Sequence, residues 1–186
     1  WIAAWRGHLE VVRLLVELGA NVETPLDDGR TPAFIAAANG HLEVLRLLVE
    51  LGADITTPNN EGATPVFIAA QKGHTEVLRD RAGVGAGVGT ALGGGRTPAY
   101  IAAQEGHLEV VRLLAELGAD VDTPNNNGAT PAWIAAQNGL VEVVRLLAEL
   151  GASVDTPKNN GATPAYVAEA KGHAGVVRLL AELEAE

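Results

Sequence analysis

The sequence predicts an all-α solenoid, in which stacked helix-turn-helix units carry projecting hairpin loops. The first observation is a period of 33 residues, marked by a G-x-T-P tetrapeptide that begins at Gly29, Gly62, Gly95, Gly128 and Gly161. The second is that each period contains two short segments with helix start and stop signals. A unit of this size cannot bury its own apolar face, so neighbouring units must stack to form a continuous core.

Counted from the residue before each marker glycine, the chain divides into six units that form a single repeat domain over residues 1–186. The units are Trp1–Asp27, which lacks its start, Asp28–Asn60, Glu61–Gly93, Gly94–Asn126, Asn127–Asn159 and Asn160–Glu186. The chain opens inside a unit, which is typical of a trimmed fragment from which a targeting signal would be missing.

Each complete unit opens its first helix with Thr-Pro. The threonine side chain can cap the helix, and proline is tolerated at the first helical position because the N–H that it lacks would have no partner there. In the unit Asp28–Asn60 we expect this helix over residues 32–39, ended by Gly40.

The second helix of that unit is expected over residues 42–51, ended by Gly52. Its apolar side chains fall on one stripe, and its charged side chains Glu43, Arg46 and Glu50 fall on the opposite face at i, i+3 and i+4 spacing. We interpret the charges as a solvated outer face. Residues 53–62 are rich in turn formers and are expected to form an extended loop or hairpin.

The unit Glu61–Gly93 departs from this pattern after Arg79. Asp80-Arg81 replace the expected leucine pair, and seven glycines lie between Gly83 and Gly95. The lost leucines forfeit roughly 3–6 kcal/mol, and each glycine inside a helix costs about 1 kcal/mol more. We therefore expect the second helix to be shortened or frayed beyond Arg79, and this joint to be the softest in the array. The glycine run lacks the G-x-x-x-x-G-K-[ST] pattern of a phosphate-binding loop.

Composition excludes several functional classes. A net charge of −10 without a basic cluster argues against nucleic-acid binding. The chain has no cysteine, so neither a disulfide framework nor a thiolate zinc site is expected. No run of 18 or more apolar residues predicts a membrane span. No signal peptide, membrane span or cysteine is seen, which favours an intracellular location, and we expect no cofactor.

Two motifs carry a resemblance to a known family. T-P-x-x-x-A-A is followed by G-H-x-E-V-x-R-L-L-x-E-L-G-A-D, and the five T-P pairs of the G-x-T-P markers and five G-H pairs recur at one period. This pattern resembles the ankyrin repeat over the whole chain. The resemblance implies antiparallel helix pairs stacked side by side, hairpins at right angles to the helices, and a concave surface that binds other proteins.

The chain departs from the family where Leu-His usually follows Thr-Pro. It has a small residue and an aromatic one instead, as in Ala33-Phe34, Val66-Phe67, Ala99-Tyr100, Ala132-Trp133 and Ala165-Tyr166. We interpret this as an exchange of volume between the two positions. The family's histidine supports hydrogen bonds between repeats, so we expect the aromatic rings to supply that cohesion here.

The five histidines, in contrast, share one other position of the repeat: His8, His41, His74, His107 and His173. A place at the start of the second helix explains all five. Catalytic and metal sites need unlike groups to converge on one point, whereas a translational repeat spreads equivalent groups apart. We therefore expect no catalytic site, no metal site and no enzyme activity.

By family resemblance, the residues that meet a protein or peptide partner lie at the hairpin tips and at the ends of the first helices. The tip candidates are Asp27, Asp28, Arg30, Asn59, Asn60, Glu61, Arg96, Asn125, Asn126, Asn127, Lys158, Asn159 and Asn160. The helix-end candidates are Trp5, Arg6, Asn39, Gln71, Lys72, Gln104, Glu105, Gln137, Asn138 and Lys171. Amides dominate, which suits polar, hydrated recognition. Asparagine is also the residue that such turns need, so a purely structural interpretation stays open.

Trp5 is the aromatic residue outside the common register, because the other units have Ala or Gln at its position. It is interpreted either as an anchor for a partner or as a residue that a preceding repeat once covered. The sequence thus predicts a protein-protein interaction scaffold. The alternatives are a structural spacer or spring without a dedicated partner, and the repeat fragment of a larger protein whose activity lies elsewhere.

The last unit keeps Leu179, Leu180 and Leu183, where a capping repeat would carry polar residues. We therefore expect both ends of the array to be exposed and to allow end-to-end self-association.

Overall fold

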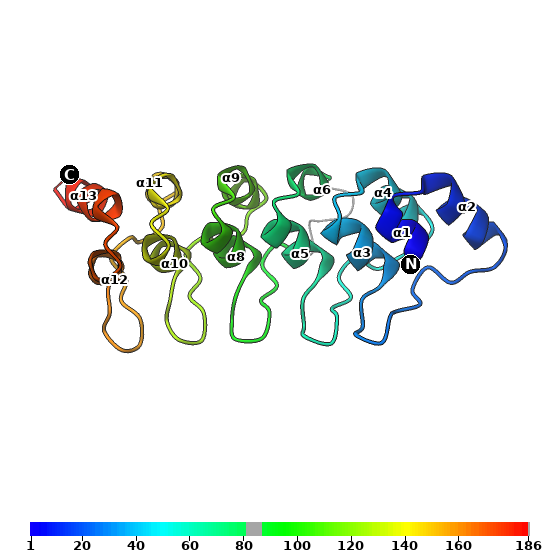
Figure 1. Ribbon diagram of the computed structural model, residues 1–186, viewed down its shortest axis with the longest axis horizontal. Coiled ribbons are helices and arrows are strands. Elements are labelled where there is room, and N and C mark those ends of the chain that lie inside the picture. Colours follow the sequence, from blue (N-terminus) through cyan, green and yellow to red (C-terminus); the bar gives the residue numbers. More distant parts are fainter. Residues whose placement is uncertain (81–86, 186) are drawn as a thin grey trace.

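The computed structural model describes residues 1–80 and 87–185, and the regular structure of these residues is helical. The helices form a row of pairs along one axis, with one helix of each pair in an upper layer and one in a lower layer (Figure 1). The lower layer consists of α1 (Ile2–Arg6), α3 (Pro32–Ala38), α5 (Pro65–Lys72), α8 (Pro98–Glu105), α10 (Pro131–Gln137) and α12 (Pro164–Ala170). The upper layer consists of α2 (Leu9–Glu17), α4 (Leu42–Glu50), α6 (Thr75–Arg79), α9 (Leu108–Glu116), α11 (Val141–Glu149) and α13 (Ala174–Leu183).

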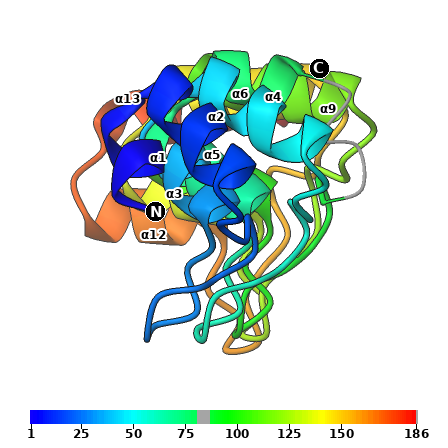
Figure 2. The ribbon, with the colours of Figure 1, turned by 90° about the vertical axis from the view of Figure 1, so that its right-hand side faces the viewer.

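The loops between units leave the helices as hairpins that all project to one side (Figure 2). Each is closed by two backbone hydrogen bonds across its tip, such as those from Asn59 N to Ala63 O at 2.8 Å and from Gly62 N to Asn59 O at 2.9 Å. The sequence therefore predicted the architecture correctly, and the helix ends of the unit Asp28–Asn60 fall within one residue of the expected positions.

The Thr-Pro signal starts the lower-layer helices as predicted. The threonine Oγ1 accepts a hydrogen bond of 3.1–3.2 Å from the backbone N–H three residues later, at Thr31, Thr64, Thr97, Thr130 and Thr163. Proline occupies the first turn of each of these helices. The capping hydroxyl and the amide satisfy each other, which allows the first four threonines to be buried in the stack.

Burial of the aromatic side chains shows that each unit depends on the one that follows it. Phe34, Phe67, Tyr100 and Trp133 are between 3% and 5% exposed, whereas Tyr166 at the same position of the last unit is 64% exposed. The difference is the helix pair that packs on each of the first four rings. The rings therefore lie between units, where aromatic side chains that supply cohesion between repeats are expected to lie.

The upper-layer leucines show the opposite dependence. Leu47 and Leu48 of α4 are 3% and 2% exposed, but their counterparts Leu14 and Leu15 in α2 are 54% and 42% exposed. These side chains are therefore buried by the preceding unit. Together, the two dependences confirm that neighbouring units supply each other's core.

The charged face of the upper-layer helices is solvated, as predicted. Arg46 lies 2.9 Å from Glu43 on its own helix and 2.7 Å from Asp80, which follows α6. Arg79 makes a similar bridge from α6 to Glu109 on α9. These arginines are about half exposed, so each pair contributes little on its own.

In the third unit, α6 ends at Arg79 after five residues, whereas α4 and α9 have nine. The backbone of Asp80 has a ψ angle of 90° and does not continue the helix. The predicted shortening is thus confirmed. Predicted fraying over residues 81–86 lies outside the described residues.

The two ends of the row differ, and the expectation for the last unit was wrong. Leu179 and Leu180 are 2% exposed, because they face the preceding unit. The open position of this unit is Glu169, where the other lower-layer helices have an alanine that is at most 1% exposed (Ala4, Ala37, Ala70, Ala103 and Ala136). A polar replacement is therefore present at this end.

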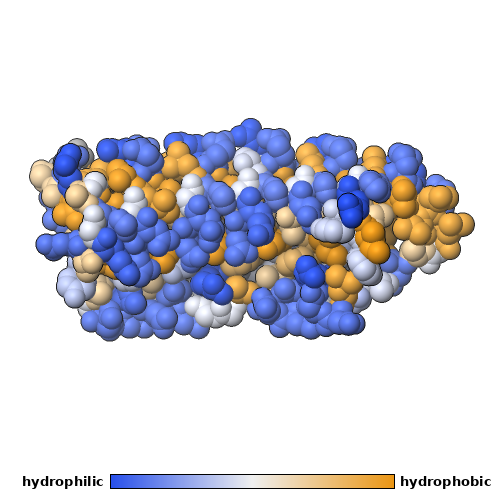
Figure 3. Space-filling view, in the orientation of Figure 1, coloured by the Kyte–Doolittle hydropathy of each residue, from blue (hydrophilic) through white to orange (hydrophobic). Residues whose placement is uncertain are grey.

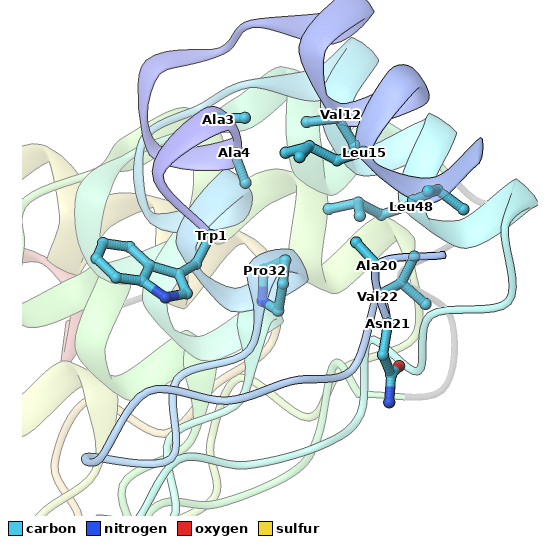
Figure 4. Close-up of a pocket in the computed structure, with 11 residues that line it drawn as sticks. Trp1, Ala3, Ala4, Val12, Leu15, Ala20, Asn21, Val22, Pro32 and Leu48 are labelled. Carbon is cyan, nitrogen blue, oxygen red and sulfur yellow. The ribbon is translucent and has the colours of Figure 1, made fainter. Parts of the chain in front are cut away.

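The end that holds α2 is apolar, and it appears as the orange surface at the right of Figure 3. Its exposed side chains include Val11, Leu14, Leu15 and Leu18. A small hollow of about 50 Å³ opens beside them, lined among others by Val12, Leu48 and Pro32 (Figure 4). Among the described helices, none is long and apolar enough to cross a membrane.

Candidate functional site

The hairpin tips are joined to one another by an asparagine ladder. Asn60 donates its backbone N–H to Asp28 O at 2.9 Å and its side-chain Nδ2 to Asp27 O at 3.0 Å. Asn159 repeats both bonds, to Asn127 O at 3.0 Å and to Asn126 O at 3.1 Å. These bonds hold adjacent tips in a fixed register.

The marker glycines are needed for this close approach. Gly29 has a φ angle of +81°, and a Cβ atom there would lie 2.5 Å from Asn60 Oδ1 and 2.8 Å from Asn60 N. Any side chain would therefore be strained by the backbone angle and would also displace the neighbouring tip.

The ladder is interrupted at the third unit, where Gly93 replaces the asparagine. Asn126 N still donates to Gly94 O at 2.9 Å, but among the described residues no hydrogen bond joins Gly93 N to Glu61 O. A Cβ atom at Gly62 would be 3.8 Å from Gly93 N, about 1 Å farther than at Gly29. The joint between these two hairpins is therefore looser than the others.

Other candidate amides brace their own turns. Asn59 Oδ1 accepts from Ala63 N at 2.8 Å, and Asn125 Oδ1 accepts from Ala129 N at 3.0 Å. Asn160 Oδ1 accepts from Ala162 N at 3.1 Å. The structural interpretation of the tip asparagines is therefore supported at Asn59, Asn60, Asn125, Asn159 and Asn160.

The aromatic residues link the lower helices to the next hairpin. Asn125 Nδ2 donates to the hydroxyl of Tyr100 at 3.2 Å, and Trp133 Nε1 donates to Ala162 O at 2.8 Å. Burial raises the pKa of the Tyr100 hydroxyl, so it stays protonated at neutral pH. Hydrogen bonding between a lower-layer helix and the next hairpin is thus present at Tyr100 and at Trp133.

The helix-end candidates lie on backbone fixed by the histidines. The Nε2 atom of His41 is 3.0 Å from the carbonyl oxygen of Trp5 in the preceding unit, and His74, His107 and His173 make the same contact with Ala38, Gln71 and Gln137. A carbonyl can only accept, so Nε2 carries the proton. The predicted place of the histidines at the start of the second helix is correct, but sequence reasoning missed this bond to the neighbouring unit.

The fifth unit shows how the bond is replaced. Leu140 occupies the histidine position and cannot donate, and Asn138 Nδ2 instead donates to Gln104 O at 3.0 Å. Asn138 is therefore a structural residue as well as a candidate. Asn39, its counterpart three units earlier, instead donates its Nδ2 to Ile35 O within its own helix at 2.8 Å.

Several candidate side chains remain exposed and are not used by the scaffold bonds above: Arg6, Asp27, Glu61, Lys72, Asn127 and Lys171. Asp28 pairs with Arg30 at 2.7 Å, and the backbone N–H and guanidinium of Arg30 lower the pKa of this carboxyl group. Lys158 lies over the Trp133 ring, 4.5 Å from its centroid. Gln104 donates to Glu105 at 2.9 Å, Gln71 and Gln137 are partly buried, and Arg96 is partly buried beside its hairpin.

Trp5 lines a hollow of about 420 Å³ between α1, the first hairpin, α3 and α5. The indole is 49% exposed, and the Arg6 guanidinium lies 4.5 Å from its ring centroid. Within residues 1–80 and 87–185, no three His, Asp or Glu side chains converge as they would around a metal ion.

Comparison with known proteins gave a family and a structural relative. The family model described as ankyrin repeats in three copies matches residues 1–80, 58–125, 81–158 and 117–186. The crystal structure of an ankyrin repeat domain from Acinetobacter baumannii AYE is similar, with a TM-score of 0.85 and 25% sequence identity over 98% of this chain and 96% of that one. A search of curated proteins found no match.

Proposed function

The chain belongs to the ankyrin repeat family, and from that premise we propose that it is a protein-protein interaction scaffold without catalytic activity. The proposed binding surface, called the recognition face below, consists of the hairpin tips and the C-terminal ends of the lower-layer helices. We further propose that residues 1–186 form one repeat domain.

The observation that carries this proposal is that some residues of the recognition face fix its backbone while others expose side chains to solvent. Its backbone is fixed from unit to unit by the asparagine ladder and by the histidine bonds to the helix-end carbonyls. Between these fixed points, Lys72, Glu105, Asn127 and Lys171 present exposed side chains of varied chemistry. A surface whose backbone is ordered before binding loses less conformational entropy when a partner binds.

The spacer alternative predicts that the exposed side chains of the recognition face bind no partner. We would combine Lys72→Ala, Glu105→Ala and Asn127→Ala in the full chain and compare protein capture from extracts of the source cell with that of the unaltered chain. The matched control combines Glu50→Ala, Arg112→Ala and Glu149→Ala on the outer face. Loss of capture by the first variant alone, at an unchanged melting temperature, supports the scaffold. Equal capture by all three proteins supports the spacer.

Self-association is supported at one end only. The end of α2 exposes Leu14, Leu15 and Leu18, whereas the opposite end presents Glu169. Head-to-tail stacking would bury the carboxylate of Glu169 at a position where the other units have a buried alanine, at a high desolvation cost. If copies associate, we propose that the apolar ends meet each other, and light scattering of Leu14→Glu beside the unaltered chain tests this. A mass that rises with concentration equally in both proteins would contradict it.

A further inference from the structure

The hollow beside Trp5 has the dimensions and lining of a binding pocket for one side chain of a partner. Its volume of about 420 Å³ lies within the range of roughly 300–1,000 Å³ typical of ligand pockets. Leu26, Ile35 and Ala38 contribute apolar surface from the hairpin and from α3. Trp5 supplies an aromatic wall from α1, and about half of this side chain is open to solvent.

This aromatic wall is found in one unit of the array. The positions equivalent to Trp5 are Ala38, Gln71, Gln104, Gln137 and Ala170, of which none offers a comparable apolar surface. Tryptophan, with tyrosine and arginine, is enriched among the few residues that dominate the binding energy of protein interfaces. The hollow is therefore the place on the recognition face where an apolar side chain of a partner would bury the most apolar surface.

The charges around the hollow are opposite to those of the molecule as a whole. The chain carries a net charge of −10, yet the lining of the hollow contains Arg30 and Lys72 and no carboxylate. Arg6 adds a third cation over the Trp5 ring. Asp28 pairs with Arg30, but among the described residues Arg6 and Lys72 have no carboxylate within ion-pair distance.

We propose that this hollow binds an aliphatic or aromatic side chain of an extended acidic peptide, whose flanking carboxylates pair with Lys72 and Arg6. This proposal rests on the scaffold function proposed above and assigns a partner chemistry to one part of the recognition face. The negative outer surface repels such a peptide, while the cations around Trp5 attract it, so the field of the protein steers it to the hollow.

The test uses the full chain and two short, N-acetylated and C-amidated peptides labelled with fluorescein. The first has a central leucine flanked on each side by two glutamates, and the second has lysine in place of every glutamate. Fluorescence anisotropy is measured at low and at high salt. We expect the acidic peptide to bind and its affinity to fall at high salt, because salt screens the carboxylates. We expect the basic peptide not to bind.

Two variants and their matched controls locate the site. Trp5→Ala removes the indole of Trp5 from the hollow and leaves Trp1 as its remaining aromatic lining residue. Gln104→Ala changes the same register position elsewhere in the array. Lys72→Glu reverses a charge at the hollow, and Lys171→Glu makes the same change at the equivalent position of the last unit. We expect about a tenfold or greater loss of affinity for Trp5→Ala and Lys72→Glu, and little change for the controls. Lys72 is exposed, so its substitution keeps the test valid if Trp5→Ala impairs folding.

Absence of binding by the acidic peptide overturns the proposal, as does equal binding of the basic one. Equal effects of Lys72→Glu and Lys171→Glu also overturn it, because the peptide would then bind elsewhere. None of these results removes the scaffold function, which is judged separately by capture from cell extracts.

Discussion

Leucine-to-alanine substitutions at one repeat position in different units measure how much of the stability at that position comes from burial by a neighbouring unit. Leu14, Leu47 and Leu146 occupy one position of the repeat, but they are 54%, 3% and 2% exposed. In a domain whose units fold independently, Leu→Ala would cost about the same at all three. In a stack, the cost depends on whether a preceding unit covers the side chain.

The structure sets the expected size of the difference. Truncation of a buried leucine costs about 2–5 kcal/mol, through lost transfer free energy and the cavity that remains, so Leu47→Ala and Leu146→Ala belong in that range. Full burial of a leucine is worth about 1.5–3 kcal/mol, and Leu14 realises roughly half of it and leaves no enclosed cavity. We therefore expect Leu14→Ala to cost about 1 kcal/mol.

The free energy of unfolding is obtained from urea titrations followed by far-UV circular dichroism. Repeat arrays can unfold in parts, so amide exchange of each unit should accompany the titration and show where stability is lost. Losses for Leu14→Ala and Leu47→Ala that agree within experimental error would refute the argument that the preceding unit buries this position.

Three further predictions concern residues at the contacts between units. Gly128→Ala and Gly161→Ala each place alanine at a φ near +80°, but only at Gly128 would the new Cβ meet the next hairpin, at Asn159. We therefore expect Gly128→Ala to lower the melting temperature more than Gly161→Ala does. Equal losses would contradict the role of the asparagine ladder in holding adjacent hairpins together. Asn138→Ala should lower the free energy of unfolding by about 1 kcal/mol. The loss should be clearly smaller in a Leu140→His background, because the introduced imidazole can bond to Gln104 O in place of Asn138. A double-mutant cycle that shows no coupling between positions 138 and 140 would contradict this. Burial raises the pKa of Asp122, whose Oδ1 has no hydrogen-bond partner among the described residues, so the folded state binds this proton more readily and the ionised form costs stability as pH rises. Asp122→Asn should therefore stabilise the chain at pH 7 by less than about 1 kcal/mol, and the gain should vanish below the ordinary pKa of 3.8; urea titrations at both pH values would contradict this if the gain persisted in acid.

The sequence predicted features that depend on local chemistry. The Thr-Pro caps, the glycine stops and the apolar stripe of each upper helix are set by residues a few positions apart, so the helix ends around Thr31 and Gly40 could be placed almost to the residue. The early end of α6 at Arg79 belongs to the same class, because the lost leucines and the glycines that follow are visible in the chain.

Features that depend on which neighbour a residue faces could not be placed in the same way. Leu179 and Leu180 were expected to be exposed because the apolar stripe was unmodified, but in a stack this stripe faces the preceding unit. A signal for the polar end existed at Glu169, which stands where the other units have alanine. The His41 contact with Trp5 O joins residues 36 apart, and nothing in a single sequence relates these positions.

The candidate residues of the proposed recognition face fall into two groups: those that hold neighbouring units together and those whose side chains are exposed and make no such bond. Asn60 and Asn159 hold the hairpins in place through bonds to backbone atoms, so their side chains cannot be exchanged without loss of the frame. Lys72 and Lys171 occupy equivalent positions but contribute to no scaffold bond among those of the described residues, and Glu105 occupies that position in another unit. Substitution at this position alters the charge presented to a partner while the carbonyl-to-histidine bonds keep the backbone fixed. At Lys72, Glu105 and Lys171 the proposed recognition face can therefore change its charge without loss of a bond between units, whereas Asn138 at the same position of the repeat supplies such a bond.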